Sequence, residues 1–303
     1  MIKKKKGNCL LVFDSAYNYG FLRDRNLEVF VTSKDLDGYF DHVWTVNPFA
    51  DVELEKSDKV RFGKSRCVKL SERHTMLECR MGLHKFLRFV PPLNFVLAQM
   101  NLVLSVYRLM RRYDIKFVRA EDPLINGFYG MLFSKLFRLP LLIGVWGNPD
   151  DIRKQTKKPL MPRAFPFLRA EEIWEKRILK FAKIVMVQNH DNRKFVSEKG
   201  IPESRIVEFT LDNAVHENHF LEPSERPSAK ADLEEYGITS EKVVLCLSRL
   251  VDSKRVDQAV LAIAEDSLSG FDVRLLLVGD GSDKEELKDL AINLGVEKKV
   301  IFT

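Results

Sequence analysis

The chain has 303 residues, of which 45% are hydrophobic and 30% are charged, a balance typical of a globular protein of about two domains. The net charge of +6 is compatible with anionic partners such as phosphates, nucleotides or an acidic membrane surface, but a solvated basic surface is the favoured explanation. No zinc finger, ribonucleoprotein motif or basic zipper is present, which argues against a nucleic acid partner. The four cysteines are scattered without a C-x-x-C pair, so we expect no metal site, no disulfide framework and a cytoplasmic location.

The N-terminal region predicts the start of an α/β domain. Lys3–Lys6 precede an apolar run of only five residues, Cys9–Phe13, which is too short for an export signal and predicts a first buried strand. Residues 27–31 and 43–46 predict two further short strands. Residues 51–85 are charged and irregular, and they support no assignment.

Residues 80–112 hold a long apolar run with arginines at both ends. Pro91 and Pro92, together with several amide side chains, interrupt this run and argue against a helix that spans a membrane. A basic amphipathic helix lying on an acidic membrane is one alternative. A core helix packed on the sheet is favoured, because the strand Ile115–Val118 follows at once.

The middle of the chain repeats a strand–helix pattern. The predicted elements are helices at 124–139, 171–181 and up to Gly200, and strands at 141–145, 184–187 and 206–209. Ile173, Trp174, Ile178, Leu179 and Phe181 are the expected buried residues of the second helix. The basic, proline-containing segment 151–169 predicts a long loop, and such loops are commonly functional.

The C-terminal region predicts βαβαβ, half of a doubly wound nucleotide-binding domain. The expected strands are Val243–Leu247, buried on both faces, then Val273–Val278 and Val300–Phe302. Helical spacing follows each of the first two strands, with Ser282 and Glu285 as a capping box. Gly295 predicts the end of the second helix.

These C-terminal residues carry a resemblance. The segments Ser248-Arg249-Leu250, Lys254 and Val278-Gly279-Asp280-Gly281 resemble the donor domain of GT-B glycosyltransferases, specifically glycosyltransferase family 4. The resemblance implies that Arg249 and Lys254 hold the diphosphate of a nucleotide-sugar, beside the Gly279–Gly281 turn. Two positions depart from the family pattern, because Ser248 and Arg255 each replace a glycine.

The resemblance also implies an α/β architecture of two Rossmann-like, doubly wound domains. These are an acceptor-side domain at 1–216, a linker at 217–240 and the first part of a donor domain at 241–303. The cleft side of the first domain would then include Gly20, Asp122, Trp146, Gly147 and Asn148. Trp146 stands where the family typically has histidine, so we expect no acid–base role for this position, because indole does not titrate.

The function implied is transfer of a sugar from a nucleoside diphosphate donor, with retention of configuration, to an acceptor that is a glycan, a lipid-linked sugar or a small molecule. No cofactor or metal is expected. The family's pair of glutamates would lie beyond Thr303, so we expect the chain to be the front part of a longer enzyme. A non-catalytic nucleotide-sugar-binding fragment and a GT-B-type sugar-nucleotide epimerase are the alternatives. Contact with the inner face of a membrane is a further expectation.

Overall fold

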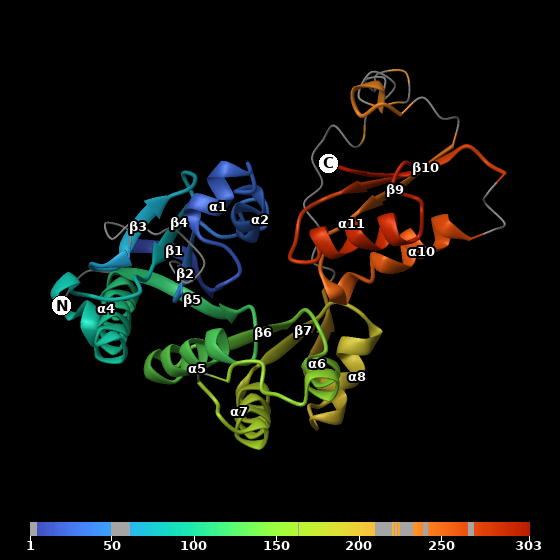
Figure 1. Cartoon of the computed structure of the whole chain (residues 1–303). Coiled ribbons are helices and arrows are strands. Elements are labelled where there is room, and N and C mark those ends of the chain that lie inside the picture. Colours follow the sequence, from blue (N-terminus) through green and yellow to red (C-terminus); the bar gives the residue numbers. More distant parts are fainter. Residues whose placement is uncertain are drawn as a thin grey trace. The chain divides into compact units, whose positions relative to one another are not determined.

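The structure, a computed structural model, describes residues 5–49, 61–162, 164–209, 220, 222, 224, 233–238, 242–265 and 270–303. The chain divides into two compact units, Met1–Val215 and His216–Thr303. Each unit has its own sheet (Figure 1). The expected linker, 217–240, lies largely outside the described residues.

Unit 1 is built on a sheet of eight strands in the order β3-β4-β2-β1-β5-β6-β7-β8. All neighbours are parallel except the antiparallel pair β3 and β4. The strands are β1 (Lys5–Phe13), β2 (His42–Asn47), β3 (Arg66–Lys69), β4 (His74–Glu78), β5 (Tyr113–Ala120), β6 (Leu141–Val145), β7 (Ile184–Val187) and β8 (Ile206–Glu208). The helices are α1 (Tyr19–Asp24), α2 (Val29–Thr32), α4 (Pro91–Arg112), α5 (Ile125–Phe137), α6 (Pro149–Thr156), α7 (Leu168–Phe181) and α8 (His190–Glu198), with 3-10 turns η1 (Ser33–Asp35), η2 (Lys85–Phe89) and η3 (Glu203–Arg205).

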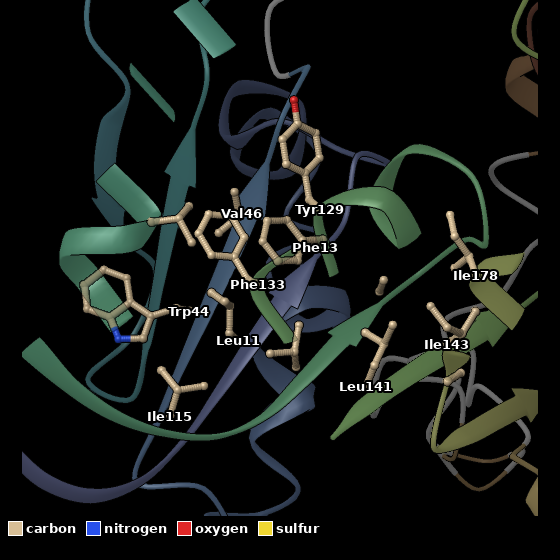
Figure 2. Close-up of a cluster of buried hydrophobic side chains, with 14 of the residues drawn as sticks. Leu11, Phe13, Trp44, Val46, Ile115, Tyr129, Phe133, Leu141, Ile143 and Ile178 are labelled. Atoms are coloured by element: carbon tan, nitrogen blue, oxygen red, sulfur yellow. The ribbon is translucent and has the colours of Figure 1, made fainter. Parts of the chain in front are cut away.

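The core of unit 1 follows from the alternation of side chains along β1. Leu11 and Phe13 point into the main apolar cluster, whereas Leu10 and Val12 pack on the opposite face of the sheet. Figure 2 shows Phe13 beside Tyr129 and Phe133 of α5, and the ring centroids are 5.7 and 5.8 Å from that of Phe13. Burial on both faces explains why the sequences of the central strands are continuous apolar runs.

Helix α4 is a core helix, as expected. Pro91 and Pro92 occupy its first turn, where proline costs no intrahelical hydrogen bond, so they begin the helix and do not interrupt it. Ala98, Leu102 and Val106 are buried in the main cluster. The helix is long and apolar enough to cross a membrane by length and composition, but one of its faces is packed in this core.

Glycines let α5 approach its neighbours closely. A Cβ at Gly127 would lie 2.8 Å from Ile178 of α7, and one at Gly130 would lie 2.8 Å from Leu141 of β6. Both distances are too short for a side chain, so the two glycines let α5 pack directly against α7 and β6. This packing fixes the start of α5, where Asp122 and Ile125 lie.

Three expectations for unit 1 were wrong. Residues 27–31 are not a strand, because the chain turns there into the short helix α2. Segment 151–169 is not entirely a loop, because α6 extends to Thr156. In α7, Ile173 and Phe181 are exposed, while Glu171 and Glu175 are fully buried. The buried glutamates are paired with Arg153 of α6, which periodicity of apolar residues alone does not predict.

Unit 2 contains a parallel sheet in the order β11-β10-β9. Its elements are β9 (Lys242–Leu247), η5 (Asp252–Lys254), α10 (Asp257–Ala264), β10 (Val273–Val278), α11 (Lys284–Asn293) and β11 (Val300–Phe302). The predicted βαβαβ order is confirmed, and Gly295 has the positive φ of 69° typical of a helix stop.

Two local expectations for unit 2 were wrong. Strand β9 is not buried on both faces, because it is an edge strand among the described residues and leaves Leu245 61% and Leu247 74% exposed. The capping box does not form, because Asp283 is the N-cap of α11 and Ser282 Oγ donates to its carboxylate at 2.6 Å.

Candidate functional site

The carboxyl edge of the sheet in unit 2 brings together the two motifs predicted from the sequence. The turns after β9 and β10 lie side by side, because Ser248 N donates to Val278 O at 3.1 Å and Leu250 N donates to Asp280 O at 3.0 Å. The residues 248–254 and 279–281 therefore form one surface at the end of two adjacent parallel strands. Ligands of open α/β sheets bind at such edges.

Close approach of these two turns explains the glycines. A Cβ on Gly279 would lie 2.0 Å from the Ser248 carbonyl oxygen, and one on Gly281 would lie 2.0 Å from that of Leu250. Gly279 also has a φ of 146°, which side chains rarely adopt. Asp280 lies between them and its carboxylate accepts a hydrogen bond from Gly281 N at 3.0 Å.

Arg249 and Lys254 are exposed on this surface. Among the described residues, no carboxylate forms an ion pair with either side chain. Lys254 ends η5, just before the N-terminal turn of α10. Two unpaired cations at one sheet edge, with Lys254 just before a helix start, are suited to an anionic ligand, because the fixed charges and the helix dipole both favour it.

Arg255 does not crowd this turn, although it stands where the resemblance implies glycine. Its backbone has the left-handed φ of 49°, which explains why glycine is common there. Its guanidinium is turned onto Asp257, with nitrogen–oxygen distances of 3.0 and 2.9 Å. Hydrogen bonds from Arg255 hold the pKa of Asp257 well below its usual range. Arg255 is therefore neutralised, which leaves Arg249 and Lys254 as the cations of the turn.

A cavity of about 520 Å³ also lies in unit 2, between α10 and α11. Its lining includes the carboxylates of Asp252, Asp257, Asp283, Glu286 and Asp289. An anionic ligand is disfavoured there by charge, in contrast to the Arg249–Lys254 surface.

In unit 1, the carboxyl edge of the sheet holds a buried ion cluster that the sequence did not predict. Asp14 follows β1 and Glu121 follows β5, and Lys34 of η1 contacts both, at 2.5 Å from Asp14 Oδ2 and 3.3 Å from Glu121 Oε1. Arg119 lies 3.0 Å from the same Glu121 oxygen. Asp14 and Glu121 could have been predicted as site residues, because each directly follows an apolar strand. No feature of the sequence distinguishes Lys34.

Mutual pairing favours the charged forms of Asp14 and Lys34. Burial alone would raise the pKa of Asp14, but the Lys34 ammonium outweighs it and lowers that pKa. Burial alone would lower the pKa of Lys34, but Asp14 and Glu121 outweigh it and raise that pKa. The cluster is thus a self-neutralised structural element in which each charge has a partner.

Trp146 is tied into the same cluster. Its indole Nε1 donates to Glu121 Oε2 at 3.0 Å, and the Arg119 guanidinium lies 5.9 Å from its ring centroid. A Cβ on Gly144 would lie only 2.4 Å from the indole, so this glycine makes room for the ring. Trp146 consequently orients Glu121 and carries no exchangeable acid–base group.

The other residues expected on this side have local roles. Gly20 lies in the first turn of α1, which Asn18 caps by accepting a hydrogen bond from Phe21 N at 2.8 Å. Asn148 caps α6 in the same manner, accepting from Asp150 N at 3.1 Å. Gly147 links Trp146 to this cap, and a Cβ added to it would meet nothing within 4 Å.

Asp122, directly after Glu121 at this edge, has a raised pKa. Burial raises the pKa of Asp122 to about 6, against hydrogen bonds that lower it. Its carboxylate accepts from Leu124 N at 2.7 Å and from the Asn126 amide, which also donates to Ser15 Oγ at 3.1 Å. Asp122 is thereby connected through Asn126 to Ser15.

Ser15 opens onto a cavity of about 900 Å³ within unit 1. The cavity walls are mostly apolar, and the lining residues are Ser15, Ala16, Asn18, Asn47, Phe49, Met81, Pro91, Pro92, Phe95, Ile125, Leu160, Met161, Pro162 and Ala164. A few polar groups at one end of an apolar cavity are typical of a small-molecule site. Within the described part of the chain, no group of three His, Cys, Asp or Glu residues is placed to hold a metal.

Comparison with known proteins links unit 2 to sugar transfer. Residues 229–303 match the family Glycosyl transferases group 1. A GDP-mannose-dependent α-(1-6)-phosphatidylinositol monomannoside mannosyltransferase of Mycolicibacterium smegmatis is 41% identical over 78 residues, 25% of this chain and 20% of that protein. The N-acetyl-α-D-glucosaminyl L-malate synthase of Bacillus anthracis is 33% identical over 120 residues, 34% of this chain and 31% of that protein. The matches thus span less than a third of the length of these two relatives.

Solved structures show the fold. Anabaena Alr3699/HepE in complex with UDP-glucose has a TM-score of 0.61 at 17% identity, with 98% of this chain and 69% of that chain covered. The lipopolysaccharide outer core galactosyltransferase WaaB has a TM-score of 0.53 at 13% identity, with 97% and 67% covered. The expected GT-B fold, with two Rossmann-like α/β domains, is confirmed.

Proposed function

We propose that this protein is a retaining glycosyltransferase of family 4, in which unit 2 binds a nucleoside diphosphate sugar and unit 1 binds the acceptor. The observation that carries the donor assignment is the pair of exposed, unpaired cations, Arg249 and Lys254, on the glycine-lined edge of the sheet in unit 2. The family match over residues 229–303 covers the same surface.

The chemistry follows from electrostatics. A diphosphate leaving group gains negative charge as the bond to the sugar breaks, and fixed cations stabilise that charge without needing a metal. Arg249 offers several donors in a planar fork, and Lys254 a compact ammonium, both suited to phosphate oxygens. Because neither is committed to a described carboxylate, their charge is available to the ligand.

The acceptor is assigned to the cavity of unit 1. Its polar end carries Ser15, Asn18 and Asn47, and its apolar walls include Phe49, Phe95 and neighbours. This combination favours an acceptor with a hydroxyl-bearing head and an apolar portion over an unmodified glycan, because bare sugar hydroxyls would lose hydrogen bonds to water against apolar walls. A lipid-linked sugar is the acceptor class of the three that fits best.

The donor assignment is tested by binding. Nuclear magnetic resonance saturation transfer is recorded on the purified protein with a panel of UDP-, GDP- and ADP-sugars, with NAD as the comparison. We expect binding of at least one nucleotide-sugar that is displaced by the matching nucleoside diphosphate, and none of NAD. Binding of NAD alone, or of no nucleotide, would contradict the proposal.

The reaction is tested by its products. The donor that binds is incubated with lipid extract and with short glycans, and the anomeric configuration of any product is determined. An α-linked product from an α-linked donor supports retention, whereas a β-linked product overturns it. Conversion of the donor to an epimer without acceptor would identify a sugar-nucleotide epimerase, and binding without any turnover a binding module.

A further inference from the structure

The outward face of α4 is apolar, although it lies on the surface of unit 1. Leu93, Val96, Met100, Leu104 and Tyr107 follow one another at steps of three and four residues and are all exposed. Immediately before the helix, Phe86 and Phe89 of η2 are 73% and 79% exposed. We name these seven residues the α4 stripe. Contiguous exposed apolar surface of this kind marks an interaction site.

The charged side chains within the segment that carries the α4 stripe are of one sign. Residues 80–112 contain six cationic side chains and no aspartate or glutamate, so this segment alone accounts for the net charge of +6 of the entire chain. Arg108 and Arg111 continue the stripe along the helix, with Arg112 beside them, while Arg88 lies at the opposite end with its guanidinium 4.7 Å from the Phe89 ring centroid. The stripe is therefore framed by arginines at both ends.

We propose that the α4 stripe docks unit 1 onto an anionic lipid membrane, with the helix lying in the plane of the interface. The apolar side chains would enter the boundary between headgroups and acyl chains, and the arginines would contact lipid phosphates. Helix α4 lies on the surface and does not span, because its opposite face packs against the sheet through Leu102 and Val106.

Charge complementarity selects the membrane over a second copy of the chain. An antiparallel pair of α4 stripes would bring Arg108, Arg111 and Arg112 of one copy toward Arg88 of the other, with no carboxylate between residues 80 and 112 to neutralise them. Anionic phospholipids supply both the missing negative charge and an apolar phase.

The cavity of unit 1 adjoins this surface through the first turns of α4. Pro91, Pro92 and Phe95 line the cavity, while Leu93 and Val96 belong to the α4 stripe. A protein docked in this way holds its apolar cavity next to the lipid phase. The docking itself does not depend on the proposed transferase activity, so an experiment can contradict one proposal without contradicting the other.

Docking is tested by flotation of the protein with vesicles, without nucleotide. We expect the protein to float with phosphatidylcholine vesicles that contain phosphatidylglycerol, in a salt-dependent manner, and much less with phosphatidylcholine alone. The triple variant R108Q/R111Q/R112Q should lose about a hundredfold in affinity, since each cation near such a surface contributes about fivefold. The matched control is K176Q/R177Q/K180Q on the exposed face of α7, which should bind as the unchanged protein does.

The apolar contribution is tested with F86S/F89S, for which the control is Ile173→Ser, at an exposed position of α7. F86S/F89S should float weakly even at low salt, while unfolding at the same temperature as the control. Equal flotation of all variants, or equal binding to heparin and to vesicles, would overturn the proposal. So would a dimer, seen by light scattering, that dissociates in F86S/F89S, because the occupant would then be a second copy.

Discussion

The carboxyl edges of the two sheets both carry cationic side chains, but these differ in burial and in ion pairing. In unit 1, Lys34 and Arg119 are buried and paired with Asp14 and Glu121. In unit 2, Arg249 and Lys254 are exposed, and no described carboxylate pairs with them. A cation that already has its partner stabilises the fold, whereas one left without a partner is available to a ligand.

Pairing and burial therefore distinguish cations that stabilise the fold from cations that are available to a ligand, which residue type alone does not. Each of the four cations lies at the carboxyl edge of its sheet, so position in the fold alone would mark each as a candidate for phosphate binding. Pairing and burial divide them, and they also predict that substitutions will affect stability in unit 1 and ligand affinity in unit 2.

The largest effect is expected for the buried arginine of α6. Arg153 Nη2 lies 2.9 Å from Glu171 and 2.7 Å from Glu175, both fully buried. Arg153→Met removes the guanidinium that pairs with two buried carboxylates and should lower the free energy of unfolding by about 3 to 5 kcal/mol. Chemical denaturation measures this against Arg249→Met as the exposed control. Equal stability of the two variants would contradict the claim that buried, paired cations stabilise the fold more than exposed ones.

The second effect is a change of stability with pH at Asp122. Because its pKa is about 6 in the folded protein and 3.8 in the reference state, the folded state binds more protons between these values. Stability contributed by this group is present below pH 3.8 and lost as the pH rises toward 6. Asp122→Asn should remove this decline, roughly 2 to 3 kcal/mol at most.

Unfolding midpoints at several pH values compare this variant with Asp151→Asn, at an exposed position of α6. Identical pH profiles for both variants would show that Asp122 has no raised pKa and behaves like a surface carboxylate.

The third effect concerns the packing of the turns in unit 2. Gly281→Ala places a Cβ within 2.0 Å of the Leu250 carbonyl oxygen, so the two turns must separate. We expect a loss of about 1 to 3 kcal/mol and weaker nucleotide binding. Gly270→Ala is the control, because a Cβ there meets nothing within 4 Å. A Gly281→Ala protein that binds nucleotide normally would show that the contact between the turns does not shape the site.

The smallest effect on stability is expected at the proposed donor site itself. R249Q/K254Q removes two exposed charges and should change the free energy of unfolding by less than about 0.5 kcal/mol. Thermal unfolding checks this. A large loss would mean that the two cations stabilise the fold and that the contrast between the units fails.

Local patterns in the sequence predicted much of this structure. The strands Leu141–Val145 and Ile184–Val187 and the βαβαβ order of unit 2 are confirmed, because apolar β-branched runs and helical spacing are properties of neighbouring residues. The turns at Arg249 and Gly279 were predicted because family motifs are local as well. Whether these residues bind a donor stays a prediction.

Contacts between distant residues explain what the sequence missed. Lys34 reaches Asp14 across 20 positions, and Arg153 reaches Glu175 across 22, so no periodicity reveals their pairing. Strand β9 has the composition of a buried strand, but its exposure is decided by its place at the edge of the sheet. The sequence showed that α4 is rich in apolar residues. It did not show which of them are exposed, because that depends on which face of the helix packs on the sheet.

The central claim is that Arg249 and Lys254 bind the donor diphosphate, and the most direct test measures how much the diphosphate adds to nucleoside affinity. Calorimetry compares UDP with uridine, or GDP with guanosine, on the unchanged protein, on R249Q/K254Q and on the control Lys288→Gln of α11, whose side chain is 40% exposed. Each charge-assisted contact contributes about 1.5 to 3 kcal/mol, so the double variant should lose about a hundredfold or more of the affinity gained from the diphosphate. Nucleoside affinity should stay unchanged. If the diphosphate adds the same affinity in all three proteins, the two cations do not hold it and the account of unit 2 is wrong.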